Sequence, residues 1–311
     1  MTVWDLIDET PPRVLRGHRW PVYALGWSPD GKLLASSGWD NAIRLWDPIS
    51  RACVEKQRDP DNPDNSFFRM AWSPDGQRLA SGTYRHGVLV WEVTARSQRW
   101  VGRQLTTLIR CVAWSPDGTL LVGGGEDDHV YLWDASDGAL RRRLAGHQGF
   151  VTSVAWSSDG TRLASSGSGQ GQGGSGEVLV WDVRRGERLQ TFAEYPGRVL
   201  TLDWSSRGEL MVSGDSAGML RWWDVQRGEC VRVDQGAVQS LRISPDGRRL
   251  ASCGDDGAIN VWDLESGERL RTLRRDRPYE RLNITGVKGL TEAEIATLRA
   301  LGAIEEVTLP L

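Results

Sequence analysis

A short motif returns along the chain at a nearly constant spacing, and this repetition constrains the fold more than any other feature. Ser-Pro-Asp-Gly occupies residues 28–31, 73–76, 115–118 and 244–247, with near copies at 157–160 and 205–208. The spacing between successive copies is 39 to 48 residues. A period of this size indicates structural units that stack and bury their faces against one another.

A second motif, Trp followed by an acidic residue, closes each repeat. It occurs at Trp4, Trp46, Trp91, Trp133, Trp181, Trp223 and Trp262. Five more tryptophans directly precede the S-x-x-G turn, so the repeat accounts for 12 of the 16 tryptophans in the chain. Trp222 lies outside both motifs, next to Trp223. Because adjacent strand positions point to opposite faces, we expect one of these two to be less buried.

Each repeat has the pattern of short antiparallel strands. Apolar runs such as VYALGW, KLLASSG and AIRLW alternate with turn signals. In Ser-Pro-Asp-Gly, Pro restricts φ, Asp can bond back to the backbone, and Gly accepts a positive φ. A further strand follows each Trp-Asp, as at 138–147. Four strands in about 40 residues predict the blade of an all-β propeller.

These motifs resemble the WD40 repeat family. Its pattern is fullest in RGH…LLASSGWDNAIRLWD (16–47) and AGH…RLASSG…EVLVWD (145–182), and the resemblance covers about residues 1–275. It implies a WD40 β-propeller over 1–275. Six complete units and a partial one at the start of the chain predict seven blades, one of them incomplete or irregular. The alternative count is six.

Residues 276–311 depart from the repeat. We expect a helix near 291–301, with Thr291 and Glu294 as a capping box and Gly302 as its stop, packing on the propeller or completing it. The stretch RPYERLNITGVKGLTEAEIATLRALGA also resembles the end of WD40 regions in bacterial proteins with a NACHT or NB-ARC signalling NTPase. This implies that the chain is the C-terminal sensor part of such a protein.

The WD40 resemblance implies a buried structural network rather than catalysis. His18, Ser36, Asp40 and Trp46 match the four parts of the family's network. His147, Ser165 and Trp181 match three, because the Asp position falls in the Gly-rich stretch 166–177. The same residue types occur in Ser-His-Asp hydrolases, but no catalytic set recurs at matched blade positions. We expect no catalytic residue, no metal, no cofactor and no enzyme activity.

The resemblance also implies where binding takes place. WD40 domains mostly bind proteins or peptides across one face near the central channel, and two positions per blade face it. The implied binding residues are Tyr23, Trp39, Phe68, Tyr84, Arg110, Glu126, Phe150, Thr152, Arg198, Leu200, Ser216, Gln239 and Asp255. Several are aromatic or Arg, the residue types that dominate binding energy. We expect a protein-interaction scaffold or a ligand-sensing propeller. The alternatives are a structural or oligomerisation module and a propeller hydrolase.

Composition and charge restrict the classes of partner and the cellular locations that we expect. The chain carries 38 Lys and Arg against 41 Asp and Glu, so its net charge of −3 does not favour nucleic acid. No apolar run reaches the roughly 20 residues of a membrane span, and the N-terminus lacks a secretory signal. The four cysteines have no metal or disulfide spacing. We therefore expect a cytoplasmic protein with a protein or peptide partner and no membrane association.

Overall fold

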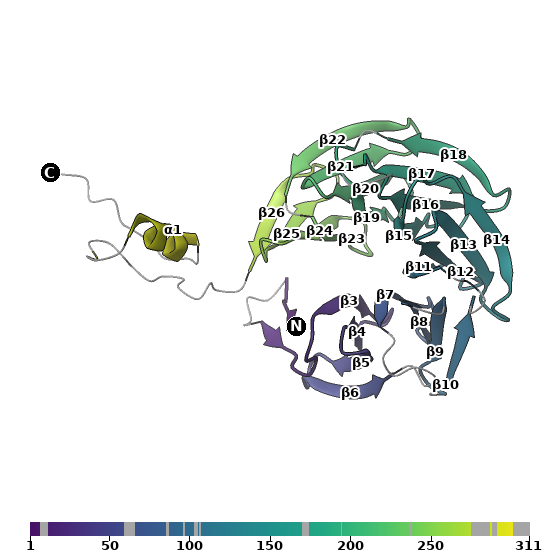
Figure 1. Ribbon diagram of the computed structural model, residues 1–311, viewed down its shortest axis with the longest axis horizontal. Helices are drawn as coiled ribbons and strands as arrows, with labels where there is room; N and C mark the ends of the chain where they lie inside the picture. Colours follow the sequence, from purple (N-terminus) through teal and green to yellow (C-terminus); the bar gives the residue numbers. More distant parts are fainter. Residues whose placement is uncertain are drawn as a thin grey trace.

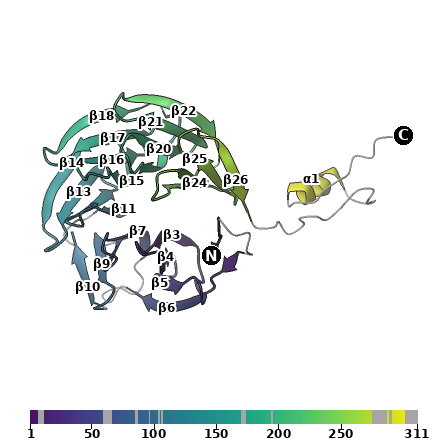
Figure 2. The ribbon, with the colours of Figure 1, turned by 180° about the vertical axis from the view of Figure 1, so that it is seen from behind.

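Six antiparallel sheets stand side by side around a common centre in the computed structural model of the chain (Figures 1 and 2). The structure describes residues 1–6, 12–58, 66–84, 87–95, 97–102, 105, 107–169, 174–193, 195–236, 238–274, 287 and 291–300. Each of the six sheets has four strands whose order in the sheet follows the chain. This is the blade arrangement that the repeat predicts.

We number the blades in chain order. Blade 1 contains β3 (Val22–Trp27), β4 (Leu34–Gly38), β5 (Ala42–Asp47) and β6 (Ala52–Gln57). Blade 2 contains β7 (Phe67–Trp72), β8 (Arg78–Thr83), β9 (Val88–Glu92) and β10 (Ser97–Val101). Blade 3 contains β11 (Ile109–Trp114), β12 (Leu120–Gly125), β13 (His129–Asp134) and β14 (Leu140–Ala145).

The second half of the ring repeats this plan. Blade 4 contains β15 (Val151–Trp156), β16 (Arg162–Gly167), β17 (Glu177–Asp182) and β18 (Glu187–Phe192). Blade 5 contains β19 (Val199–Trp204), β20 (Leu210–Asp215), β21 (Met219–Asp224) and β22 (Glu229–Gln235). Blade 6 contains β23 (Ser240–Ile243), β24 (Arg249–Cys253), β25 (Ile259–Asp263) and β26 (Arg269–Leu273).

The incomplete blade is a sheet of two short strands, β1 (Thr2–Val3) and β2 (Arg13–Val14). We call this sheet the half-blade. It lies between blade 6 and blade 1 (Figures 1 and 2). Its apolar residues Met1, Val3 and Leu15 pack on Leu34 and Trp46 of blade 1. The expected propeller with one incomplete blade is thus confirmed, as six full blades and a half-blade.

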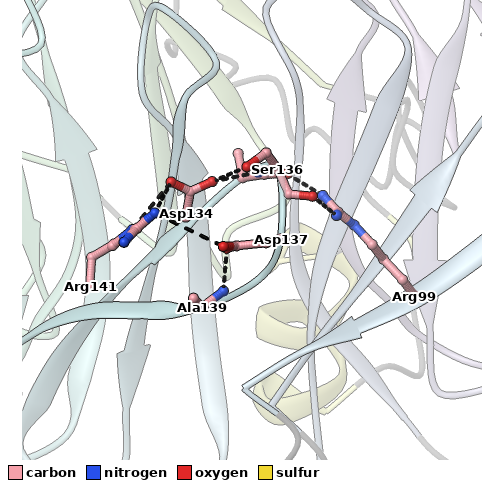
Figure 3. Close-up of polar contacts among 7 residues, drawn as sticks. Arg99, Asp134, Ser136, Asp137, Ala139 and Arg141 are labelled. Carbon is pink, nitrogen blue, oxygen red and sulfur yellow. Dashed lines mark hydrogen bonds and ion pairs between the residues drawn. The ribbon is translucent and has the colours of Figure 1, made fainter.

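The two repeated motifs build the two kinds of turn. In the first copy of Ser-Pro-Asp-Gly, the Ser28 hydroxyl donates to Asp30 Oδ1 (2.6 Å), and Gly31 adopts a φ of 71°. Five of the acidic residues that follow a closing Trp accept backbone N–H groups of the next turn: Asp47, Asp134, Asp182, Asp224 and Asp263. Asp134 Oδ1, for example, accepts the N–H of Ser136 at 2.8 Å (Figure 3). The motifs therefore recur because each one satisfies the backbone of a tight turn.

The closing tryptophans form the core between blades. Trp46, Trp91, Trp133, Trp181, Trp223 and Trp262 are all buried. Removing one indole from water hides about 150–250 Å², worth roughly 4–6 kcal/mol before entropy is counted. Trp222 is buried as well, so the expectation that it or Trp223 would be less buried is wrong. β21 is an interior strand: Trp223 packs with residues of blade 4, and Trp222 with residues of blade 6.

The tail contains the helix α1 (Glu292–Ala300). The Thr291 hydroxyl accepts the N–H of Glu294 (3.3 Å), and Glu294 Oε2 accepts the N–H of Thr291 (2.8 Å). The predicted capping box is therefore confirmed. Gly302 lies outside the described residues. The packing of this helix on the propeller stays a prediction.

Candidate functional site: a hollow at the mouth of the channel

The antiparallel register of each blade gathers two sets of residues at one end of the ring. β3 begins where β4 ends, with Val22 opposite Gly38, and β19 begins where β20 ends, with Val199 opposite Asp215. Residues at the start of the first strands therefore share this end with residues that follow the second strands. These are the two positions per blade from which the binding residues were predicted.

A hollow of about 990 Å³ opens at this end of the ring. We call it the mouth hollow. Ten of the thirteen predicted binding residues line it: Tyr23, Trp39, Phe68, Tyr84, Arg110, Glu126, Thr152, Leu200, Gln239 and Asp255. Its volume is in the range that takes up a small molecule or a few side chains of a peptide. The role of these residues in binding stays a prediction.

One wall of the mouth hollow is aromatic and comes from blades 1 and 2. The rings of Tyr23 and Trp39 meet edge to face with centroids 5.8 Å apart. Phe68 and Tyr84 form a second pair at 6.4 Å. Tyr23, Trp39 and Tyr84 are exposed even though large apolar rings favour burial. Rigid, amphipathic rings that already touch each other lose little conformational freedom when a ligand covers them.

The wall that blade 3 contributes is charged and held in place. Arg110 Nε donates to Glu126 Oε1 at 2.5 Å. The Arg110 guanidinium also lies against the ring of Phe150, 5.3 Å from its centroid, and near that of Phe68, at 6.0 Å. Arg110 is thus fixed between a carboxylate and two aromatic rings, which limits the rotamers it can adopt.

Arg69 on β7 was missed by the sequence reasoning, and it reaches across the channel. Its Nη2 donates to the backbone oxygen of Leu200 on β19 at 3.1 Å. Burial, together with the nearby charge of Arg242, lowers the pKa of Arg69 to about 10, so it stays charged at neutral pH. The sequence contains an indication of this role, because Arg69 is a long charged residue at a repeat position where the other blades have short side chains. Those residues are Ala24, Cys111, Ser153, Thr201 and Ser240.

Three predicted binding residues lie outside the mouth hollow. Phe150 contacts it only through Arg110. Arg198 and Ser216 bond to each other on blade 5, where the backbone N–H of Arg198 donates to the Ser216 hydroxyl at 3.0 Å. Leu25, Arg242 and Cys253 line the hollow and were not predicted. They lie on blades 1 and 6, on either side of the half-blade.

The four-residue network of blade 1 is continuous. His18 Nδ1 bonds Asp40 Oδ1, His18 Nε2 bonds the Ser36 hydroxyl, and the Trp46 indole donates to the same hydroxyl, each at 2.7 Å. Asp40 also accepts from Arg44 at 2.6 Å. Burial lowers the pKa of His18 despite its carboxylate partner, which favours the neutral ring. Ser36 is fully buried, so this Ser-His-Asp set cannot meet a substrate.

Blades 4 and 5 carry variants of the network, of which the sequence reasoning predicted His147, Ser165 and Trp181 in blade 4 but missed the acid of blade 4 and the network of blade 5. In blade 4, His147 and Trp181 share the Ser165 hydroxyl, and Glu177 takes the place of the acid, 3.1 Å from His147 Nδ1. In blade 5, the hydroxyl of Tyr195 replaces the imidazole and bonds Ser213 at 2.7 Å. The variant in blade 5 was detectable, because Tyr195 precedes β19 by four residues, as His18 precedes β3.

Neither a metal-binding cluster nor a disulfide bond is present among the described residues. Among the described residues, no three His, Cys, Asp or Glu side chains are placed to hold a metal ion. The four cysteines, which all lie in the described part, are not joined by disulfide bonds. No helix in the described residues is long and apolar enough to cross a membrane.

Comparison with known proteins agrees with the repeat. The family model for the WD domain, G-beta repeat, matches residues 9–47, 62–92, 100–134, 138–182, 186–224 and 228–263. Rattus norvegicus coronin-7 is 44% identical over 48 residues, 15% of this chain and 5% of that protein. Arabidopsis thaliana periodic tryptophan protein 2 is 44% identical over 57 residues, 18% and 6%. Danio rerio guanine nucleotide-binding protein subunit beta-5b is 39% identical over 46 residues, 15% and 12%. The chain thus matches only a small part of each of these proteins.

Proposed function

The chain belongs to the WD40 repeat family, and from this premise we propose that it is a non-catalytic interaction module that binds a peptide segment of a partner protein in the mouth hollow. The observation that carries the proposal is the convergence of ten separately predicted residues on one hollow. A WD40 propeller suits a protein-interaction scaffold because its packed blades hold loops and strand ends in a fixed arrangement.

The lining of the mouth hollow indicates the chemistry of the segment. Arg69, Arg110 and Arg242 line it against Glu126 and Asp255, so positive charge exceeds negative although the whole chain is acidic. Glu126 is already paired with Arg110. We expect a segment with at least one acidic residue near the arginines and an apolar or aromatic residue on the rings of Trp39 and Tyr84.

Selection from a library of random linear peptides displayed on phage tests this proposal without knowledge of the partner. The full chain is the bait. Selected peptides should be enriched in Asp or Glu and in aromatic residues. The variant Trp39→Ala/Tyr84→Ala should bind them at least about tenfold more weakly, because it removes the rings that cover the apolar residue.

The matched control is Leu189→Ala/Val231→Ala. Both residues are exposed and apolar, and they lie on the outer strands β18 and β22, away from the mouth hollow. This variant should bind the peptides like the unmodified chain. Equal loss of binding in both variants, or peptides without acidic residues, would contradict the proposal.

We further propose that the chain is the C-terminal sensor part of a larger bacterial signalling NTPase and is cytoplasmic. The support is the resemblance of RPYERLNITGVKGLTEAEIATLRALGA in the tail. An antibody against the propeller should then detect, in extracts of the source cells, a cytoplasmic protein much larger than 311 residues. A band at the size of this chain alone would rule the larger protein out.

A further inference from the structure

Two arginines of the mouth hollow end beside the same strand, β19. Arg69 on β7 reaches the Leu200 oxygen from across the channel (3.1 Å), and Arg242 on β23 approaches Asp203 Oδ1 to 4.0 Å from the neighbouring blade. Both arginines line the mouth hollow. Two positive charges therefore share the part of the hollow next to β19, where they repel each other unless an anion lies between them.

Neither charge meets a close carboxylate in the described part of the chain. The partner of Arg69 is a neutral carbonyl oxygen. Asp203 Oδ2 accepts the backbone N–H of Ile243 at 2.8 Å, which fixes this carboxylate at the outer limit of an ion pair with Arg242. Burial and the charge of Arg242 lower the pKa of Arg69 to about 10, as expected of a cation with little compensation.

The other charged groups that line the mouth hollow are engaged. Glu126 Oε1 accepts from Arg110 Nε at 2.5 Å, so this pair is neutral as a whole. Asp255 Oδ2 accepts from the Gln239 amide at 3.2 Å. An incoming anion would therefore be attracted to the two arginines beside β19 rather than to Arg110.

We propose that Arg69 and Arg242 bind the acidic side chain of the partner segment, with its carboxylate between the two guanidinium groups, and that Arg110 does not select for charge. This inference rests on the proposed function, since it names the residues that select the acid in the same hollow. The Arg242 side chain is 59% exposed, so it can turn from Asp203 toward the carboxylate. Each guanidinium presents N–H donors in a planar array that fits carboxylate oxygens.

Blade 2 also limits the spacing between the acidic residue and the residue that covers the rings. The backbone N–H of Tyr84 donates to the Ser66 oxygen at 3.2 Å, and Ser66 stands three positions before Arg69. The Tyr84 ring and the Arg69 side chain thus start from neighbouring points at one end of the blade. Since an extended chain spans about 3.3–3.6 Å per residue, we expect the acidic and the apolar residue of the segment within about four positions of each other.

A library-selected peptide with one acidic residue, synthesised with a C-terminal amide, is the probe, and its analogue with Asn or Gln at that residue is the comparison. The full chain should bind the acidic form at least about tenfold more tightly than the amide form in calorimetry. In Arg69→Met/Arg242→Met the ratio of the two dissociation constants should fall to about one, because no guanidinium is left to bind the carboxylate.

Folding of this double variant is checked by circular dichroism, since Arg69 is half-buried. Arg242→Met alone changes an exposed side chain and should lower the ratio at least about threefold. Arg110→Met should weaken both forms alike and keep the ratio. The matched control Arg248→Met removes an exposed charge from blade 6 at the opposite end of the ring and should change neither constant.

A ratio that survives in Arg69→Met/Arg242→Met, or that is lost in Arg110→Met, overturns the proposal. So does a selected set in which the acidic and the apolar residue stand far apart. The proposed function still stands in these cases if Trp39→Ala/Tyr84→Ala weakens binding of both forms. If that variant binds both forms like the unmodified chain, the proposed function itself is contradicted.

Acidic residues of the chain outside the described part are tested in the same assay. Asp61 and Asp64 precede β7, and Glu305 and Glu306 lie in the tail. The variants Asp61→Asn/Asp64→Asn and Glu305→Gln/Glu306→Gln should bind the acidic form like the unmodified chain. Tighter binding of the acidic form to either variant overturns the proposal, since an acid of the chain itself then competes for the two arginines.

Discussion

A single hydroxyl serves two buried partners in blade 1, and this makes Ser36 the residue on which the local network depends. It bonds both His18 and the Trp46 indole, whereas Ser252 of blade 6 accepts only the Trp262 indole, at 2.9 Å. Trp133 shows that the hydrogen bond from the indole of the closing Trp to a serine is dispensable where packing compensates for it. Gly123 stands at the serine position there, and the Trp133 N–H has no partner among the described residues.

We predict that Ser36→Ala lowers the free energy of unfolding by about 1–3 kcal/mol, because it leaves two buried polar groups without a partner. Ser252→Ala removes one bond and should cost about 1 kcal/mol. Urea denaturation followed by tryptophan fluorescence measures both. Equal losses in the two variants would show that the network of blade 1 contributes no more than an isolated bond.

Acid should destabilise the fold through His18. Burial lowers its pKa below the usual 6.5, so folding favours the neutral ring. The unfolded chain then binds more protons than the folded chain as pH falls below about 6.5, and stability falls with it. His18→Gln cannot titrate there, so its urea midpoint should change less between pH 7 and pH 5 than that of the unmodified chain. An identical change in both proteins would contradict this account.

At the scale of the element, side chains on the outer strands of blades 2 and 3 bind the blade that follows. Arg99 on β10 donates to the Ser136 oxygen (2.6 Å) and to the Ala135 oxygen in the turn of blade 3 (Figure 3). Arg142 on β14 donates to the Arg184 oxygen (2.9 Å) and the Arg185 oxygen (3.1 Å) of blade 4. Both donors are arginines, and they stand at the same place in the blade, opposite the residue that precedes the closing Trp.

We predict that Arg142→Met lowers the free energy of unfolding by up to about 1 kcal/mol, because hydrogen bonds to two backbone oxygens are lost. The effect should persist at high salt (~0.5 M), since the acceptors carry no net charge. Arg141→Met is the matched control: Arg141 pairs with Asp134 in its own blade at 2.8 Å, and salt screens that exposed pair. A loss for Arg142→Met that disappears at high salt would contradict this role.

The sequence predicts the elements well because each turn motif is local. Ser28 and Asp30 satisfy a turn made of their own neighbours, so the blade pattern can be read without tertiary information. The network of blade 4 could not be read in this way. Glu177 reaches His147 across the Gly-rich insertion, and only the folded chain shows that the insertion brings an acid to the vacant place.

At the scale of the whole molecule, the ring brings together residues that are far apart in the chain. Arg69 and Leu200 are 131 positions apart and meet across the channel. The succession of blades could be predicted from the spacing of the repeat. Ten residues of the lining of the mouth hollow could be predicted from their positions in the WD40 pattern. The exposure of Leu25 could not, since its side chain is as apolar as those of Val154 and Leu202, which are buried at the same repeat position. Its environment depends on a neighbouring sheet rather than on its own sequence.

The central claim is that the mouth hollow receives a partner segment while the blades act as a rigid frame. Hydrogen exchange on the full chain, with and without a library-selected peptide, tests it most directly. We predict that exchange slows where the first strands begin and the second strands end, around Tyr23, Trp39, Tyr84 and Arg110, and stays unchanged on the outer strands. Slowing confined to outer strands such as β6, β14 and β18 would contradict the claim.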